Sequence, residues 1–174
     1  ETEIFARRIS AATGAPLGAR AVRVSTMGPD GDPAYDAQDA AVAFDSVHRE
    51  WLVVWAGETN EGGLVGGEFE IYGQRLDALG REIGANDFRI SDMGPDGDPL
   101  YDAAHPRVTY NPTDGECLVV WDGDDNAAGT VEGELEIFGQ RLDATGAGVG
   151  TNDFRISAMG PDADAGFDAP KPAV

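Results

Sequence analysis

The amino-acid sequence predicts an all-β protein built from copies of one antiparallel unit. An acidic loop motif occurs three times, as TMGPDGDPAYD at residues 26–36, DMGPDGDPLYD at 92–102 and AMGPDADAGFD at 158–168. Successive copies begin 66 positions apart, and the apolar segments between them recur at the same spacing. These segments are short and lack the 3.6-residue period of a helix. A repeat of this length indicates one supersecondary unit whose core forms between neighbouring units.

Each unit is predicted to end in a hairpin of two outer strands. Residues 70–76 alternate their side chains between two faces, which is the period of a strand. Leu79 and Gly80 then turn the chain, since glycine adopts a positive φ without strain. The returning strand is expected at residues 87–91. Equivalent hairpins are expected within residues 1–25 and 136–157.

Two inner strands are predicted to precede each complete hairpin. The first is short and follows the acidic loop, at residues 41–44 and 107–110. The second, at 51–55 and 117–121, is apolar without alternation, as expected of a strand covered on both faces. Loops rich in Gly, Asp, Glu and Asn are expected at 56–67 and 122–133.

Four short antiparallel strands in up-and-down order make up a β-propeller blade. The predicted architecture is therefore a series of tandem four-stranded blades that is β-propeller-like, as a partial propeller or a repeat array. A solenoid or a row of small sandwiches would also satisfy the repeat. We expect a partial repeat of two outer strands and an acidic loop at 1–38, a complete repeat at 39–104, and at 105–174 a last repeat, its acidic loop and the start of a next strand.

The incomplete first blade predicts association with further units. It lacks two strands, and unpaired strand edges invite pairing. We expect a piece of a longer array or a protomer that neighbouring chains complete, which would build a ring or a filament depending on whether the rotation closes.

Composition excludes several classes of partner. Twelve basic and 32 acidic residues give a formal net charge of −20, which repels nucleic acid and anionic membranes and favours cations. No apolar run approaches the roughly 18 residues of a membrane span. Cys117 has no second cysteine to pair with, and it takes the position that Trp51 has in the preceding repeat. We expect it to be a buried apolar residue.

The acidic loops are the predicted metal sites. Asp96 and Asp98 are spaced to direct two carboxylates at one point across a tight turn, and Asp102 approaches from the other side. Carboxylates about 4 Å apart repel by about 1 kcal/mol per pair even in water, and a divalent cation removes this repulsion. Ca²⁺ accepts such oxygen ligands in flexible geometry. The predicted calcium ligands are Asp30, Asp32, Asp36, Asp96, Asp98, Asp102, Asp162, Asp164 and Asp168.

The alternative interpretation is that Asp, Gly and Pro only form turns. In the third copy, Gly97 and Pro99 are replaced by alanine, whereas all three aspartates remain, and this favours ligands. Other recurring charges are expected to be structural. The recurring glutamates are expected at strand edges or beside Arg75 and Arg141; they are Glu68, Glu70, Glu134 and Glu136. Arg89 and Arg155 are expected to pair with Asp87 and Asp153.

No catalytic motif is present. The sequence has no nucleophile elbow, no HExxH and no glycine-rich phosphate loop before a helix. His48 and His105 lie at different phases of the repeat, so they do not form a recurring site. We therefore expect a protein without enzymatic activity.

The segments LVVW, EIFGQRLD and DFRIS, with the inserted MGPDGDPxYDA loop, resemble the repeats of large bacterial secreted or surface β-propeller-like proteins. The resemblance implies an extracellular or cell-surface scaffold or binding role and no particular reaction. The predicted function is a non-enzymatic calcium-binding protein in surface structure, adhesion or filament assembly, with self-association, neighbouring repeats and surface glycans as candidate partners. One alternative is a propeller domain of a larger secreted carbohydrate-active enzyme or carbohydrate-binding protein, and another is a cytosolic interaction scaffold.

Overall fold

A computed structural model describes residues 1–125 and 130–174 of the chain. Residues 126–129, within the loop expected at 122–133, lie outside this description. The described residues form antiparallel sheets of two, four and four strands, and they contain no helix. Accordingly, no described helix has the length and hydropathy needed to cross a membrane. The predicted all-β fold class is confirmed.

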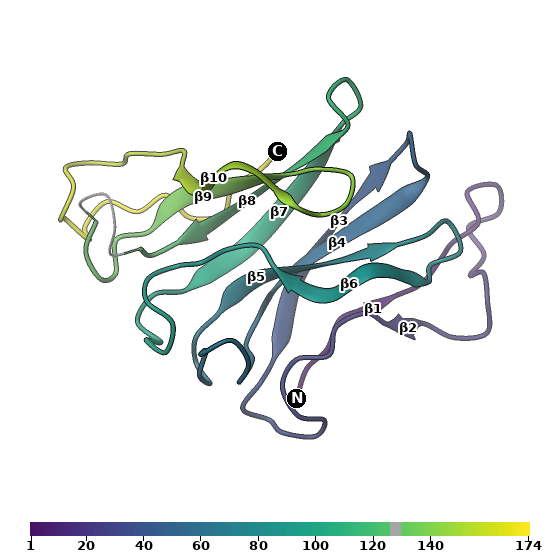
Figure 1. The fold of residues 1–174 in the computed structure, drawn as a ribbon, viewed down its shortest axis with the longest axis horizontal. Coiled ribbons are helices and arrows are strands. Elements are labelled where there is room, and N and C mark those ends of the chain that lie inside the picture. The colour runs from purple at the N-terminus through teal and green to yellow at the C-terminus, as the bar shows by residue number, and fades with distance from the viewer. Residues whose placement is uncertain (126–129) are drawn as a thin grey trace.

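The two larger sheets have the same design, with their strands in chain order (Figure 1). The first contains β3 (Ala37–Asp45), β4 (Glu50–Gly57), β5 (Glu70–Leu76) and β6 (Glu82–Arg89). The second contains β7 (Ala103–Asn111), β8 (Glu116–Gly123), β9 (Glu136–Leu142) and β10 (Gly148–Arg155). The small sheet pairs β1 (Phe5–Ala6) with β2 (Val22–Arg23). Below, repeat 1 denotes residues 1–38, repeat 2 residues 39–104 and repeat 3 residues 105–174.

Several strands extend beyond their predicted limits, and β3 and β6 illustrate why. β3 begins at Ala37, where the backbone N–H donates to the carbonyl of Thr2 at 2.8 Å, and it continues past a register shift between Gln38 and Ala41. β6 begins at Glu82, although residues 82–86 lack an apolar alternation. Pairing with β5 extends the strand, and a second register shift separates its two halves.

The apolar strand β4 contributes to two cores, which explains its lack of alternation. Val53 and Trp55 pack with residues of repeat 1, whereas Leu52 and Val54 pack with the sheet of repeat 3. The first strands of the two large sheets, β3 and β7, lie side by side (Figure 1). Each core therefore forms between repeats, as the repeat length predicts.

The surface that is buried at one junction is open on repeat 3. Ile90 and Met93 of repeat 2 are 5% and 0% exposed, and the indole N–H of Trp121 lies 3.5 Å from the Met93 sulfur. Their equivalents in repeat 3, Ile156 and Met159, are 50% and 48% exposed. Repeat 3 thus covers this face of repeat 2, whereas no described residue covers the same face of repeat 3.

Candidate functional site

One arginine in each repeat joins the sheet to its acidic loop. The guanidinium of Arg89 donates to the buried carboxylate of Glu70, and its Nη1 donates to Asp96 Oδ1 at 2.7 Å. Glu70 also accepts from the Ser91 hydroxyl and from the Met93 backbone N–H. The same pairs recur as Arg155 with Glu136 and Asp162, and as Arg23 with Glu3 and Asp30.

These partners correct the pairs expected from the sequence. Arg89 contacts Glu70 and Asp96, and its predicted pairing with Asp87 is wrong; Arg155 likewise contacts Glu136 and Asp162. Arg75 pairs with Glu50 at 2.5 Å and Arg141 with Glu116 at 2.7 Å, because these side chains lie diagonally across neighbouring strands on one sheet face.

The two equivalent glutamates, Glu70 and Glu136, have pKa values shifted in opposite directions. Burial raises the pKa of Glu70 to about 7, against the lowering effect of Arg89 and Ser91. At Glu136 burial again raises the pKa, but the hydrogen bonds from Ser157 and Arg155 outweigh it and leave the pKa below its usual value. The difference follows from the open face of repeat 3, because less protein surrounds Glu136.

The second aspartate of each loop closes the turn. Asp98 Oδ1 accepts from the backbone N–H of Leu100 at 3.3 Å, which is the side-chain geometry of an Asx turn. Asp32 and Asp164 make the equivalent bond to Ala34 and Gly166.

The third aspartate ties the end of the loop to the sheet. Asp102 Oδ1 accepts from the Phe69 backbone N–H at 2.8 Å. Asp36 and Asp168 accept in the same way from Thr2 and Leu135.

The nine predicted calcium ligands thus contact separate protein donors. Within residues 1–125 and 130–174, no group of three or more His, Cys, Asp or Glu side chains could hold a metal ion. The three carboxylates of a loop do not form the predicted cluster, and calcium binding stays a prediction.

Two of the recurring glutamates expected at strand edges or beside Arg75 and Arg141 are instead buried anchors of the loops. Glu68 and Glu134 are fully buried. The Glu68 carboxylate accepts from the backbone N–H groups of Gly97 and Val65, and Glu134 accepts from Ala163 and Val131. Their recurrence at one phase of the repeat was the signal in the sequence.

A pair of hydrogen bonds recurs at both junctions between repeats. Asp87 Oδ2 accepts from the Thr26 backbone N–H at 2.7 Å, and the Arg8 guanidinium donates to the Leu79 carbonyl at 3.3 Å. At the next junction Asp153 accepts from Asp92, and Arg75 donates to the Thr145 carbonyl. These four bonds join chain segments from consecutive repeats.

The junction aspartates carry a buried oxygen without a partner. Oδ1 of Asp87 and of Asp153 is buried and makes no hydrogen bond within the described chain. Burial raises the pKa of Asp87 to about 6 and that of Asp153 to about 7. Both groups therefore titrate closer to neutrality than ordinary aspartates.

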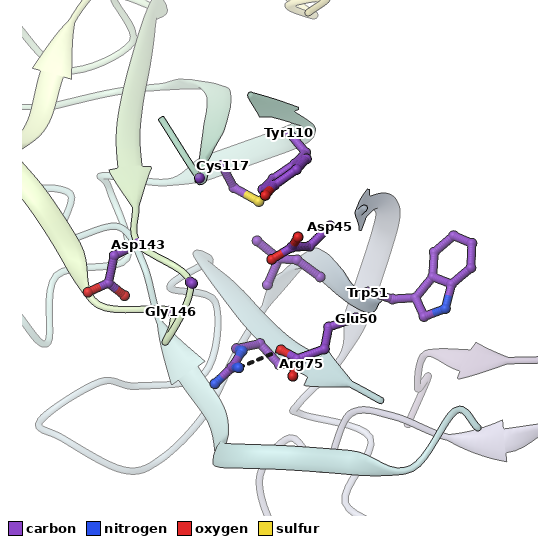
Figure 2. A pocket seen from close by; sticks show the side chains of 11 residues that line it. Asp45, Glu50, Trp51, Arg75, Tyr110, Cys117, Asp143 and Gly146 are labelled. Atoms are coloured by element: carbon purple, nitrogen blue, oxygen red, sulfur yellow. Dashed lines mark hydrogen bonds and ion pairs between the residues drawn. The ribbon is translucent and has the colours of Figure 1, made fainter. Parts of the chain in front are cut away.

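A small cavity lies at the other end of the second junction (Figure 2). It has a volume of about 20 Å³, which is room for about one water. The Arg75–Glu50 ion pair and the Tyr110 side chain line it. Cys117 is buried there, as predicted, and burial raises the pKa of its thiol to about 11, so the thiol stays protonated and unreactive at neutral pH.

Comparison of the chain with protein families, with curated proteins and with solved structures found no match.

Proposed function

We propose that this chain is a non-enzymatic structural repeat protein that assembles through the two end faces of its stacked sheets. The observation that carries the proposal is the contrast between Met93, which is 0% exposed under the next repeat, and its equivalent Met159, which is 48% exposed. Burial of apolar surface is the main driving force of association, so the open face favours a further unit of the same design.

The opposite end of the stack carries a complementary surface. Phe5 and Ile9 of repeat 1 are 61% and 54% exposed. Their equivalents in repeat 3, Phe138 and Leu142, are both 2% exposed and pack in one core with Met93. Phe5 and Ile9 would therefore fit a face like that of repeat 3, in a second copy of the chain or in a neighbouring repeat of a longer array. Such a head-to-tail contact builds a ring or a filament.

The units are proposed to be propeller-like blades. Each complete repeat has four antiparallel strands in chain order, and the first strands β3 and β7 lie side by side (Figure 1). This arrangement is typical of blades around a common axis.

An extracellular or cell-surface location is part of the proposal and rests on the resemblance to bacterial surface repeats. The lack of a catalytic role is supported by the recurring carboxylates, which are held by arginines and backbone N–H groups. Calcium would have to compete with these donors.

Sedimentation velocity over a range of protein concentrations tests the assembly. We expect association that Met159→Glu weakens on one face and Phe5→Glu on the other, because each buries a charge in the contact. Val47, which is 60% exposed in the turn between β3 and β4, provides the control variant Val47→Glu.

A mixture of the two end-face variants separates head-to-tail contact from other modes. Each variant keeps one intact face, so the mixture should form a pair of chains and nothing longer. A chain that stays monomeric at every concentration, or a mixture that does not pair, would contradict the proposal.

A further inference from the structure

We infer that a cavity between repeats 1 and 2 binds a small organic cation, namely a primary amine with a short apolar body. The cavity has a volume of about 410 Å³, within the range of small-molecule sites. The acidic loop of repeat 1, the loop after β4, and strands β5 and β6 all contribute to it. Its lining includes Met27, Glu61, Leu64, Tyr72, Asp87 and Arg89.

The first observation is a hydroxyl at the cavity wall that the fold does not require. Tyr72 is 5% exposed, its ring stacks on Trp55 with centroids 6.5 Å apart, and its side chain lines the cavity. Its hydroxyl makes no hydrogen bond to the described residues. The equivalent positions in repeats 1 and 3 are Phe5 and Phe138, so packing at this position needs only the ring. The hydroxyl is open to the cavity, so a ligand group or water there can satisfy it.

The second observation is the charge of the cavity wall. Asp87 and Glu61 make no ion pair with the described residues. Arg89 also lines the cavity, but its guanidinium is paired with Glu70, Asp92 and Asp96. The wall therefore carries uncompensated negative charge, which attracts a cation and repels an anion.

The shape of the wall selects an organic cation over a bare ion. An ammonium group near the carboxylates can donate to the Tyr72 hydroxyl oxygen and lie close to the aromatic ring, which is a favourable cation–π arrangement. Met27 and Leu64 are 1% and 4% exposed and offer apolar contact to a methylene chain. The equivalent junction between repeats 2 and 3 keeps Asp153 and has Phe138, so it lacks the hydroxyl.

Titration calorimetry of the whole chain with 1,4-diaminobutane tests the site. We expect saturable binding of one diamine per chain, with little binding of n-butanol or butyrate, which have a similar body without the positive charge. Tyr72→Phe should weaken binding by about tenfold, the effect of one hydrogen bond to a charged group. Asp87→Asn should weaken it by about tenfold or more, because it removes the charge.

The next junction supplies the matched control. Asp153→Asn makes the same chemical change at the equivalent position and should leave diamine affinity unchanged. Tyr72→Phe should fold normally because Phe138 occupies the same place in repeat 3, and circular dichroism checks this. Absence of saturation at millimolar diamine would overturn the inference. So would equally tight binding of n-butanol or glucose, or an equal loss of affinity in Asp153→Asn.

Discussion

The carboxylate of Asp153 accepts a hydrogen bond from the backbone N–H of Asp92, with 2.8 Å between Oδ2 and N, and so connects repeat 3 to repeat 2. Asp87 makes the same bond to Thr26 at the preceding junction. The two aspartates have φ angles of 47° and 44°, in the left-handed region that few residues other than glycine adopt. The backbone of each outer strand is thus shaped to direct one carboxylate at the neighbouring repeat.

Replacing this aspartate should weaken the junction. Asp153→Ala removes the acceptor and places alanine at a positive φ, so we expect a loss of about 1–3 kcal/mol in the free energy of unfolding. Asp153→Asn keeps an acceptor and a residue type that tolerates this φ, so its effect should be smaller. Urea unfolding followed by circular dichroism measures both, and an Asp153→Ala variant as stable as the parent would show that the bond is unimportant.

The protein should become more stable as the pH falls from 8 to 5. The folded pKa values of Asp87 (about 6), Asp153 (about 7) and Glu70 (about 7) lie above their ordinary values near 4, because the groups are buried. The folded state then binds more protons than the unfolded state in this window, and the stabilisation is complete below about pH 4 and lost as the pH rises through 6–7. Thermal melting at pH 8 and pH 5 checks the direction.

The control for this pH dependence is Asp153→Asn, which removes one of the titrating groups. The rise in melting temperature between pH 8 and pH 5 should be smaller in this variant. A melting temperature that decreases steadily from pH 8 to pH 5 would contradict the assignment.

The two equivalent methionines should respond differently to truncation. Met93→Ala leaves a cavity in the core between repeats 2 and 3, so we expect a loss of about 2–5 kcal/mol. Met159→Ala affects a half-exposed side chain, and a change of about 0.5 kcal/mol is expected. Chemical denaturation in dilute solution compares them; equal losses would mean that the face of repeat 3 is also covered.

Two glycines of the same acidic loop should also differ. Gly94 has φ 61°, and an added Cβ would lie 2.5 Å from Tyr101 Cγ, so Gly94→Ala should destabilise the protein by several kcal/mol or prevent folding. Gly97 has φ 87°, but the equivalent residue of repeat 3, Ala163, adopts φ 66°. Gly97→Ala should therefore cost only about 1 kcal/mol. Melting temperatures of the two variants provide the test.

Calcium binding is tested by melting the protein with added CaCl₂ and with EGTA. Asp96, Asp98 and Asp102 would have to exchange protein donors for the ion, so stabilisation should appear only at roughly millimolar calcium. Asp98→Ala should remove the response of that loop with little other effect, because among the described residues its carboxylate accepts only from the turn N–H of Leu100. A melting temperature unaffected by calcium and by EGTA would contradict the prediction that the acidic loops bind calcium.

The sequence predicts the strands well because the repeat presents the same pattern more than once. The alternation over residues 70–76 coincides with β5, and the apolar run at 117–121 lies within β8. The start of β6 at Glu82 was missed, since pairing with β5 extends a strand whose first residues have no β-forming pattern.

The charge partners could not be predicted from spacing alone. Asp87 and Arg89 are two positions apart, and in a regular strand both side chains would lie on one face. The register shift and the positive φ at Asp87 direct its carboxylate to repeat 1 instead. Arg89 is then left to reach Asp96 in the loop, so the aspartate that was expected to bind metal has a guanidinium beside it.

The arginine that braces each acidic loop also fixes how the loop is presented. Arg23, Arg89 and Arg155 hold their loops in one orientation relative to their own sheets, so the chain displays near-identical surfaces at a regular interval. A partner with several copies of one recognition group would engage consecutive loops, and every contact after the first would be intramolecular. Modest affinity for a single loop would in this way become long-lived attachment, with a strength that grows with the number of repeats.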